Sequence, residues 1–410
     1  MNTTGIHFIE DFELADKTVL LRVDFNVPVK DGVVTDDNRI RAALPTIVHA
    51  VEAGAKVILC SHFGRPSGHP DPKYSLEPVA ARLAEILDTE TLLYDTEVFF
   101  PESVIGDDVR EVISEMRGQR QVMLLENLRF HPGEKSGDDE FAKELASLAD
   151  FYINDAFGAC HRKHASVYTI NKYFDRHHRG VGYLIKSELE GLSRLLDRPP
   201  RPYVAIVGGA KVSDKLGVLN ALIDKVDSIL VGGAMAYTFL GAQGHGVGKS
   251  LVESDFMEEA KKIIDKAKAR GVDLVLPVDH RVAETFDASK AILTDGVEIG
   301  AEMMGLDIGP KTQELFEQIL SEGQTIFWNG PLGVFENPAF AEGTLSVARA
   351  LAASDAYTVI GGGDSVAAAA KAEVLDKFGH VSTGGGASLQ IVEGKTLPGI
   401  ESLRPNHPFD

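Results

Sequence analysis

Short apolar runs alternate with amphipathic, helix-like segments along the whole chain. In the first half, the runs that predict strands lie at residues 18–25, 56–62, 91–95, 121–127 and 151–157. In the second half they lie at residues 203–209, 228–233, 273–279, 325–331, 357–363 and 380–386. Strands that alternate with helices favour parallel sheets, so the pattern predicts an α/β fold with doubly wound parallel sheets.

One segment interrupts this alternation near the middle of the chain. Residues 187–203, SELEGLSRLLDRPPRPY, have a helical pattern that is broken by Pro199, Pro200 and Pro202. Because 410 residues are too many for one ordinary core, we expect two lobes joined by a helical hinge here. The predicted parts are a first lobe at residues 1–174, a hinge at 175–200 and a second lobe at 201–393.

The composition is that of a globular protein, with 44% hydrophobic and 25% charged residues. The net charge of −20 opposes attraction to nucleic acid or anionic lipid, so we expect neither as a partner. No apolar run reaches the roughly 18 residues of a membrane span, and the first residues do not resemble a signal peptide. Cys60 and Cys160 form no CxxC pair, which favours reduced thiols and a cytoplasmic location.

Glycines follow the predicted strands of the second half. Without a side chain, their backbone N–H groups can approach phosphate oxygens, and the next helix N-terminus adds a favourable field. Any single pair of glycines also fits the geometry of a tight turn between a strand and a helix. Several such turns in one lobe, however, favour a polyphosphate ligand. The glycines are Gly208, Gly209, Gly232, Gly233, Gly330, Gly361, Gly362, Gly363, Gly384, Gly385 and Gly386.

The segment GGAKVSDKLGVLNALIDKV adds two cations to this lobe. Its apolar spacing predicts a helix that begins near Lys211, which places Lys211 and Lys215 one turn apart on one face. Two cations at a helix N-terminus repel each other and oppose the helix dipole, so the arrangement favours a bridging anion. The alternative is that both lysines are solvated at the surface and that Asp214 partly offsets their mutual repulsion.

Acidic residues near the glycines suit the metal and the sugar of a nucleotide. Asp364 and Ser365 fall at the start of the helix after Gly363, where helix capping is the simple interpretation. The second interpretation makes Asp364 a ligand of the Mg²⁺ that accompanies nucleotide phosphates, and capping by Ser365 is compatible with both. Glu336 fits ribose hydroxyls, or it is an ordinary exposed glutamate.

Three other motifs do not support a site. GHGVGKS at residues 244–250 has Gln243 where a Walker A loop needs glycine, and a helical segment precedes it where a strand is required. No GxGxxG turn follows the first strand of either half, which argues against an NAD-dependent dehydrogenase. His161 and His164 lack a third zinc ligand nearby, and the pairing of Cys60 with His62 is equally weak.

The first half places cationic and hydrogen-bonding side chains at strand ends, where ligands bind in open α/β sheets. Arginine offers a planar fork that matches phosphate and carboxylate groups. One such arginine is usually a surface ion pair, but several favour a polyanionic substrate. A two-lobed binding protein that closes on a small anion would explain this half but not Lys211 and Lys215 with Asp364. The candidates are Asp24, Asn26, Arg39, His62, Arg65, Arg129 and Arg162.

Together these segments closely resemble the phosphoglycerate kinase family. The match runs from RVDFNVP through GGAKVSDK, WNGPLGVFE and GGGDS to STGGGAS and LPGI, and it covers nearly the whole chain. The resemblance implies two Rossmann-like lobes, with 3-phosphoglycerate or 1,3-bisphosphoglycerate on the first and Mg²⁺ with ATP or ADP on the second. It also implies a monomeric enzyme of glycolysis and gluconeogenesis without a prosthetic group, whose residues 394–410 return to the first lobe.

The resemblance further implies roles for individual residues. Arg39, Lys215 and N–H groups near Gly363 and Gly385 would surround the transferring phosphoryl group when the lobes close, and no general base is needed because the accepting carboxylate is already ionised. The phosphoglycerate would be held by Asp24, Phe25, Asn26, Arg39, His62, Phe63, Gly64, Arg65, Arg129 and Arg162. The nucleotide would be held by Gly208, Gly209, Lys211, Lys215, Asn329, Pro331, Glu336, Gly361, Gly362, Gly363, Asp364 and Ser365, with Asp364 on the metal.

Overall fold

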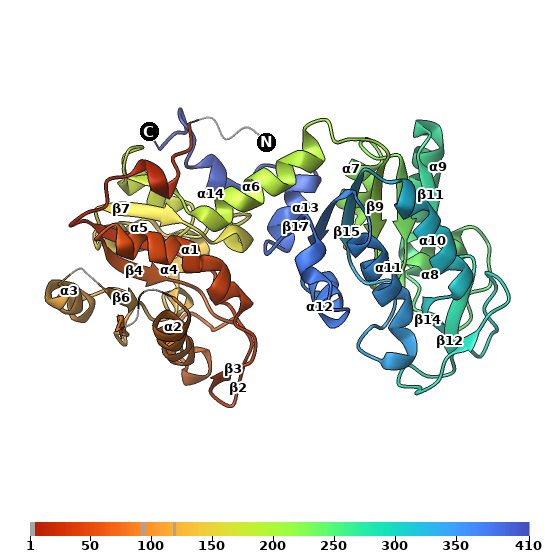
Figure 1. The fold of residues 1–410 in the computed structure, drawn as a ribbon, viewed down its shortest axis with the longest axis horizontal. Coiled ribbons are helices and arrows are strands. Elements are labelled where there is room, and N and C mark those ends of the chain that lie inside the picture. The colour runs from red at the N-terminus through yellow and green to blue at the C-terminus, as the bar shows by residue number, and fades with distance from the viewer. Residues whose placement is uncertain (1–4, 92, 94, 118–119, 410) are drawn as a thin grey trace. The chain divides into compact units, whose positions relative to one another are not determined.

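The computed structural model describes residues 5–91, 93, 95–117 and 120–409, which form two compact units. The N-terminal unit runs to Leu189 and includes the segment from Thr396 onward, and the C-terminal unit is Glu190–Lys395 (Figure 1). Helix α6, Tyr183–Leu196, crosses this division. Among the described residues, no helix is long and apolar enough to cross a membrane.

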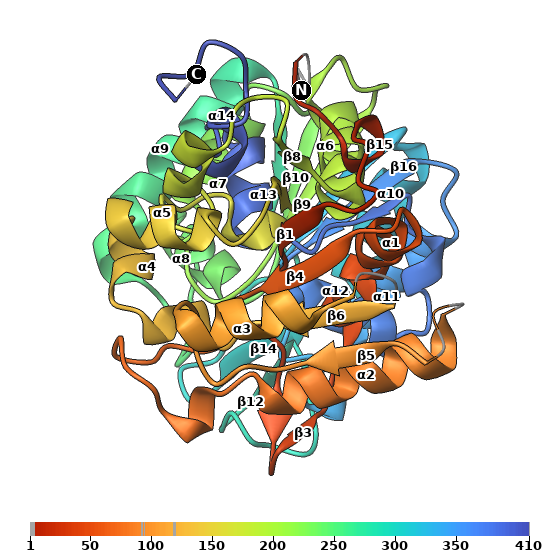
Figure 2. The ribbon, with the colours of Figure 1, turned by 90° about the vertical axis from the view of Figure 1, so that its left-hand side faces the viewer.

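A six-stranded parallel sheet with the order β5-β6-β4-β1-β7-β8 forms the centre of the N-terminal unit (Figure 2). The strands are β1 Thr18–Arg22, β4 Lys56–Cys60, β5 Glu97–Phe99, β6 Gln121–Leu124, β7 Phe151–Asn154 and β8 Arg179–Val181, and a small hairpin joins β2 Val29–Lys30 to β3 Val33–Val34. The helices are α1 Asn38–Glu52, α2 Glu77–Glu90, α3 Asp107–Glu115, α4 Gly133–Ser136, α5 Asp139–Ala146 and α14 Pro398–Glu401. Separate apolar clusters, one with Ile47 and Leu83 and one with Val109 and Phe141, join helices to the two faces. Burial on both faces explains the near-continuous apolar strands.

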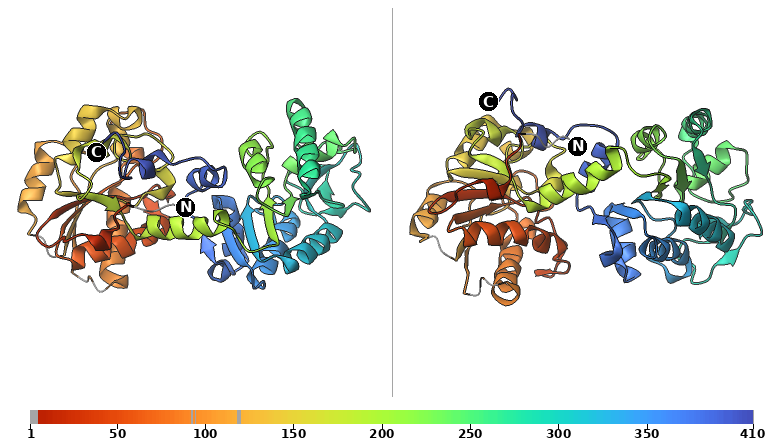
Figure 3. Two further views of the ribbon diagram at one scale, coloured as in Figure 1. Left: turned by 90° about the horizontal axis from the view of Figure 1, so that it is seen from above. Right: turned by 45° about the horizontal axis from the view of Figure 1, so that its top comes forward.

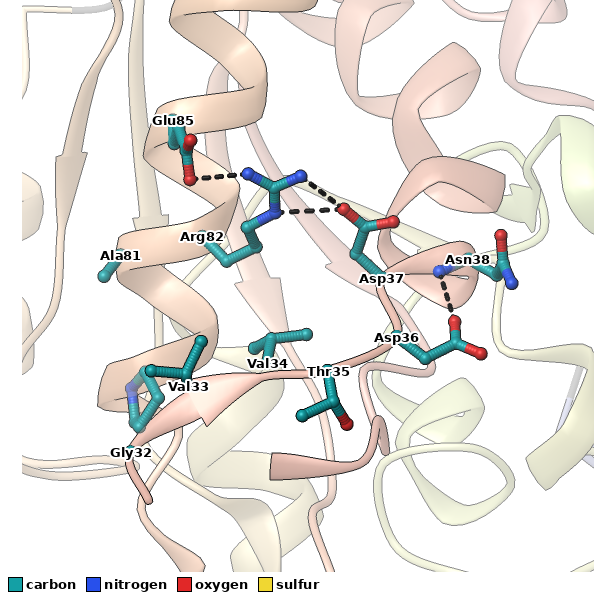
Figure 4. Close-up of a pocket in the computed structure, with 11 residues that line it drawn as sticks. Gly32, Val33, Val34, Thr35, Asp36, Asp37, Asn38, Ala81, Arg82 and Glu85 are labelled. Atoms are coloured by element: carbon teal, nitrogen blue, oxygen red, sulfur yellow. Dashed lines mark hydrogen bonds and ion pairs between the residues drawn. The ribbon is translucent and has the colours of Figure 1, made fainter. Parts of the chain in front are cut away.

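Asp37 links α1 to α2 at the surface of this unit. It precedes α1, but its side chain makes no capping hydrogen bond. Its carboxylate instead accepts from Arg41 Nε at 2.7 Å. It also accepts from Arg82 Nε at 2.9 Å (Figure 4). Arg82 also pairs with Glu85, beside an open pocket of about 710 Å³. The start of α1 is therefore held by ion pairs.

The C-terminal segment belongs to the N-terminal unit through direct hydrogen bonds. The N–H of Gly399 donates to the Cys160 carbonyl at 2.9 Å, and Asn171 Nδ2 donates to Ser402 Oγ at 2.9 Å. A Cβ built on Gly399 would lie 2.6 Å from a methyl carbon of Val167, so this approach is close. The segment that follows residue 395 is thus packed onto residues far away in the sequence.

The C-terminal unit, coloured from green to blue in Figure 3, has a second six-stranded parallel sheet. The order of its strands is β11-β10-β9-β15-β16-β17. Its strands are β9 Tyr203–Val207, β10 Ser228–Val231, β11 Asp273–Val275, β15 Thr325–Asn329, β16 Tyr357–Gly361 and β17 His380–Val381. The helices are α7 Leu216–Leu222, α8 Met235–Ala242, α9 Met257–Arg270, α10 Pro310–Glu322, α11 Glu342–Ala352, α12 Gly363–Lys371 and α13 Gly386–Val392. Trp328 lies in a buried cluster with Phe316 of α10 and Val347 of α11. The predicted α/β class with parallel sheets is confirmed.

Several strands differ from the sequence prediction. Of the strand expected at 91–95, residues 92 and 94 lie outside the described residues, and the others are not strand; the edge strand is β5, which begins at Glu97. β8 has only three residues, too few to show a period, and it was missed. An antiparallel sheet of β12 His280–Ala283, β13 Ile292–Leu293 and β14 Met304–Ile308 was missed as well. Most of these strands have only two to four residues, and such short strands carry little apolar pattern, which explains these errors.

Candidate active-site residues on the two units

Arg22 organises the candidate anion site of the N-terminal unit from within the core. It ends β1 and is fully buried. Its Nε donates to Ser166 Oγ at 2.9 Å, and that hydroxyl donates to the buried Glu134 carboxylate at 2.7 Å. Another guanidinium nitrogen lies 3.2 Å from His62 Nδ1. Sequence reasoning missed Arg22, although a charged residue inside the apolar run TVLLRVDF is a signal that could have identified it.

Asp24, Arg39 and His62 meet at the ends of β1 and β4. Arg39 Nη1 lies 3.1 Å from Asp24 Oδ2, and His62 Nδ1 lies 3.8 Å from Asp24 Oδ1. Burial alone would raise the pKa of the Asp24 carboxyl, but the positive charges around it, Arg39 and Arg22 among them, hold that pKa below its usual value. Burial lowers the pKa of His62 well below its usual value, with Asp24 opposing and Arg22 reinforcing this effect. His62 is therefore a neutral ring at pH 7.

Arg129 has an unused donor in this cationic region. It is buried, and one guanidinium nitrogen donates to the Gly64 carbonyl. Among the described residues, its Nε has no hydrogen-bond partner. Burial and the nearby Arg162 and Arg22 lower the pKa of Arg129 to about 10. A buried donor beside other cations is an arrangement that an anion would stabilise.

The other predicted residues of this unit differ from one another in exposure and in hydrogen-bond contacts. Arg162 is half-buried and its Nε donates to His161 Nε2 at 3.0 Å, whereas Arg65 is exposed. Asn26 Oδ1 accepts the Gly64 N–H at 2.9 Å, which links two loops. The side chains of Phe25 and Phe63 are buried in the apolar core, so either residue would meet a ligand only through its backbone. The described residues contain no cluster of three metal-ligating side chains.

The glycines of the C-terminal unit fall into two groups. A Cβ built on Gly208 would lie 2.2 Å from the Pro331 carbonyl, and one built on Gly330 would lie 2.2 Å from the Gly208 carbonyl. Side chains built on Gly363 and Gly385 would meet no described atom within 4 Å. The first group is required by the packing of neighbouring strand ends. The second group leaves backbone open to a ligand, as the phosphate interpretation requires.

Lys215 is directed toward the end of β15. Its ammonium group donates to Asn329 Oδ1, and Asn329 Nδ2 donates to the Gly361 carbonyl at 2.7 Å. Burial lowers the pKa of Lys215, while Asp214 and Asp364 act in the opposite direction. A partly buried ammonium group is thus held beside the glycine turn that follows β16.

The helix that was expected to begin near Lys211 begins later. α7 starts at Leu216, Lys215 is its N-cap, and the residues before it form a turn. Val212 is buried, and the N–H and hydroxyl of Ser213 donate to the Glu253 carboxylate at 3.0 and 2.6 Å. These contacts hold the segment out of the helix. The prediction that both lysines lie on one helix face was therefore wrong.

Asp364 and Ser365 occupy the first turn of α12, whose N-cap is Gly362. Ser365 is fully buried, and its hydroxyl accepts the N–H of Gly330 at 2.6 Å. The expected capping by Ser365 is therefore wrong, because its hydroxyl belongs to a tertiary contact. Asp364 is exposed, and its side chain is available to a ligand.

A pocket of about 540 Å³, here called the C-unit pocket, lies next to these turns. Five residues singled out from the sequence line it, namely Gly209, Gly233, Pro331, Glu336 and Asp364. Much of the remaining wall is apolar, and sequence reasoning missed it: Leu251, Phe286, Met304, Leu306 and Val334, with Lys249 beside them. Leu251 and Phe286 are 54% and 62% exposed, which suits a wall that a flat apolar ring would cover. These residues come from separate segments of the chain, so no local sequence pattern identifies them as one wall.

The fold and the two sites define a class of protein: an α/β protein with a cluster of cationic side chains on one unit and a pocket that contains several glycines on the other, as suits a kinase. Comparison with known proteins gives the family. The model of the family described as "Phosphoglycerate kinase" matches residues 9–395. The chain belongs to the phosphoglycerate kinase family, and it is a phosphate-transferring kinase of glycolysis.

Individual relatives agree over nearly the full length. The chain is 52% identical to "Phosphoglycerate kinase" of Clostridium botulinum (strain Alaska E43 / Type E3), over 96% of this chain and 98% of the relative. It is 52% identical to that of Anaeromyxobacter dehalogenans (strain 2CP-C), over 97% and 99%. The solved structure of phosphoglycerate kinase from Coxiella burnetii superposes with a TM-score of 0.85 at 39% identity, covering 97% of this chain and 98% of that one. The family and kinase predictions are confirmed.

Proposed function

We propose that this kinase moves a phosphoryl group reversibly between 1,3-bisphosphoglycerate and ADP, giving 3-phosphoglycerate and ATP. One observation carries the assignment of the two ligands: the two units offer different chemistry. The N-terminal unit gathers guanidinium groups around Asp24 and His62. The C-terminal unit offers open glycine backbone next to a partly apolar pocket. The first suits a small phosphorylated carboxylate, and the second suits a nucleotide.

The phosphoglycerate site is assigned to the cationic residues of the N-terminal unit. Arg129 supports it most strongly, because its buried Nε is unused among the described contacts. Arg39 and Asp24 form an ion pair that a substrate hydroxyl and phosphate can extend. The remaining contacts are assigned to Asn26, His62, Arg65 and Arg162, and to the backbone of Phe25, Phe63 and Gly64.

The nucleotide site is assigned to the C-unit pocket and the turns beside it. The apolar wall suits the base, Glu336 suits the ribose, and the open backbone at Gly363 suits the phosphates. Lys211 and Lys215 add positive charge for the phosphate oxygens. The buried Gly208, Asn329 and Ser365 act by holding the turns, together with Gly361 and Gly362.

The proposed chemistry consists of positioning and charge stabilisation. The accepting carboxylate of 3-phosphoglycerate is ionised at pH 7, so no general base is required. Arg39 and Lys215 neutralise charge on the transferring phosphoryl group, and N–H groups at Gly363 and Gly385 donate hydrogen bonds to it. Removing any of these groups should lower kcat more than it raises KM, because their effect is greatest at the transition state.

Mg²⁺ is the proposed metal, bound together with the nucleotide. Mg²⁺ is commonly held by one or two carboxylates and substrate phosphates, so a single protein carboxylate is sufficient. Asp364 fits this role, since it is exposed, lines the C-unit pocket and directly follows the open Gly363. When bound, the metal would neutralise phosphate charge.

Because the two ligands are assigned to different units, direct transfer requires the units to bring them together. The proposed hinge, residues 175–200, includes α6, which continues across the division between units. Closure would also exclude water and limit ATP hydrolysis. Small-angle scattering profiles that stay the same when both substrates are added would contradict this hinge.

The proposal includes a cytoplasmic monomer, with the two substrates as its partners and without binding to nucleic acid or membranes. The net charge of −20 supports the last point. Sedimentation velocity measured with and without substrates tests the oligomeric state. A concentration-dependent dimer would overturn the monomer assignment alone.

The decisive test is ADP formation from ATP, Mg²⁺ and 3-phosphoglycerate, with each omitted in turn. Wild-type turnover should require all three, and Lys215→Ala should abolish most of it. Lys262→Ala is the matched control, because this lysine is 73% exposed and pairs only with its helix neighbour Glu259 in the described contacts. Binding without turnover by the folded wild-type protein would favour the two-lobed binding protein instead.

A further inference from the structure

A buried acidic side chain lies behind the wall of the C-unit pocket, beside a partly exposed arginine. Asp307 on β14 is 1% exposed, and its Oδ2 accepts the N–H of Gly343 at 2.7 Å. Arg281 is its cross-strand partner on β12, with Nε 3.9 Å from the same oxygen. The function proposed above uses neither side chain.

Two atoms of this pair are unsatisfied. Within the described part of the chain, Asp307 Oδ1 and Arg281 Nε have no hydrogen-bond partner. Leaving a buried polar atom without a partner costs about 1–3 kcal/mol, so its retention calls for a reason. Oδ2 accepts the Gly343 N–H at the start of α11, which a hydrophobic residue could not do. No hydrogen bond accounts for Oδ1, so the position of this oxygen favours a role beyond the contact with Gly343.

The carboxylate touches a residue of the pocket wall. A Cβ built on Gly333 would lie 2.2 Å from Asp307 Oδ1, and one built on Gly343 would lie 2.3 Å from the same atom. Gly333 does not have a positive φ, so its backbone conformation would accept alanine. The carboxylate, and not the backbone, is what excludes a side chain at Gly333.

Gly333 connects this contact to the candidate nucleotide site. The loop 331–336 lines the C-unit pocket through Pro331, Gly333, Val334 and Glu336, and Leu306 lines it from β14. The Val334 N–H donates to the Leu306 carbonyl at 2.9 Å. The loop is thus fixed to β14 at two adjacent points, this hydrogen bond and the contact of Gly333 with Asp307.

We propose that Asp307 is a positioning residue for nucleotide binding, whose carboxylate sets how closely loop 331–336 approaches β14. The Gly343 N–H holds the carboxyl group in place. The loop then presents Pro331 and Glu336 to the nucleotide at a fixed depth. This role rests on the proposed assignment of the C-unit pocket to the nucleotide. Asp307 itself touches no reacting atom.

Two alanine variants and their combination test the contact. Asp307→Ala leaves the loop without its support, and Gly333→Ala pushes it away from the carboxylate. Each should raise KM for ATP by about tenfold, with KM for 3-phosphoglycerate and kcat within about twofold of wild type. In the double variant the new methyl group takes the space of the lost carboxylate. Its KM for ATP should therefore lie below that of either single variant.

Direct titration of each variant with ATP, without 3-phosphoglycerate, gives a second readout, and thermal melting confirms folding. Asp273→Ala, at an exposed position on β11, is the control. An unchanged KM and Kd for ATP in folded Gly333→Ala would overturn the proposal, as would equal increases in both KM values. If Asp307→Ala fails to fold, Gly333→Ala alone decides the question. A wild-type protein without ATP-dependent turnover would instead refute the proposed function.

Discussion

Ser365 and Gly330 are joined by a buried hydrogen bond: the Gly330 N–H donates to the Ser365 hydroxyl at 2.6 Å. The bond connects the first turn of α12 to the end of β15. Gly330 has a φ of +98°, a conformation that glycine adopts at little cost. The Ser365 side chain therefore links the two glycine turns after β15 and β16, and a change at that side chain should affect both.

Ser365→Ala should destabilise the C-terminal unit and weaken nucleotide binding. The substitution leaves the Gly330 N–H buried without an acceptor, which costs about 1–3 kcal/mol of unfolding free energy. Urea unfolding and ATP titration measure the two effects. Ser321→Ala, which removes an exposed hydroxyl on α10, should stay within about 0.5 kcal/mol of wild type. Equal stability of the two variants would show that the Ser365 hydroxyl does not support the turn.

Gly208→Ala should lower stability, whereas Gly363→Ala should lower the affinity for ATP, although both residues follow strands. At Gly208 the added methyl would lie 2.2 Å from the Pro331 carbonyl, so we expect a loss of about 1–3 kcal/mol of stability. At Gly363 the methyl meets no described atom within 4 Å, so the stability should hardly change. Instead, the affinity of Gly363→Ala for ATP should fall, because the methyl group enters the space proposed for phosphate. Thermal melts with and without ATP distinguish the two cases, and unaltered ATP binding by Gly363→Ala would contradict the phosphate assignment.

These glycines show which features of the fold and the candidate site could be predicted from the sequence alone. The alternation of strands and helices was enough to predict the α/β class, and the family was predicted from the resemblance of ordered motifs such as RVDFNVP and GGGDS. It could not separate Gly208, which is required by a neighbouring carbonyl, from Gly363, which faces open space. That distinction depends on which strands lie side by side, and β9 pairs with β15 although more than 100 residues separate them.

The same limitation explains the errors at individual side chains. The apolar residues around Lys211 and Lys215 do have helical spacing, but the contact of Ser213 with Glu253 moves the start of the helix to Leu216. The buried Arg22 was overlooked because its partner Ser166, and the Glu134 to which Ser166 donates, are distant in sequence. The residue types at the site were predictable from motifs. Their hydrogen-bond partners were not, because those partners are set by tertiary packing.

Asp37→Ala should cost little stability at neutral pH and nothing at low pH. Hydrogen bonds from Arg41, together with Arg82, lower the pKa of Asp37, so its contribution is present above its unfolded-state pKa and is lost as the pH falls through the folded-state value. The pairs are partly exposed and screened by salt, so about 0.5–1 kcal/mol is expected at pH 7. Urea unfolding at pH 7 in low and high salt measures it. A loss that persists unchanged in high salt would point to packing and not to the ion pairs.

Asp155 should make the stability of the N-terminal unit depend on pH in the opposite sense. Its carboxyl is fully buried at the end of β7 and accepts the N–H of Ile185, in the first turn of α6, at 3.1 Å. A Cβ built on Gly182 would lie 2.5 Å from this carboxyl group, so no space remains for relaxation. Burial raises the pKa of Asp155 to about 7, against the hydrogen bonds that it accepts.

The sign follows from proton binding. In the unfolded chain Asp155 ionises near its ordinary pKa, whereas in the folded protein it keeps its proton up to about pH 7. Between these values the folded state binds more protons, so stability falls as the pH rises, by about 1.4 kcal/mol for each unit of pKa difference. Asp155→Asn lacks this dependence. We therefore expect the stability of Asp155→Asn relative to wild type to increase from pH 5 to pH 8, as measured by urea unfolding. The measurement at pH 5 is the internal control, and a difference that does not change with pH would show that Asp155 is already ionised in the folded protein.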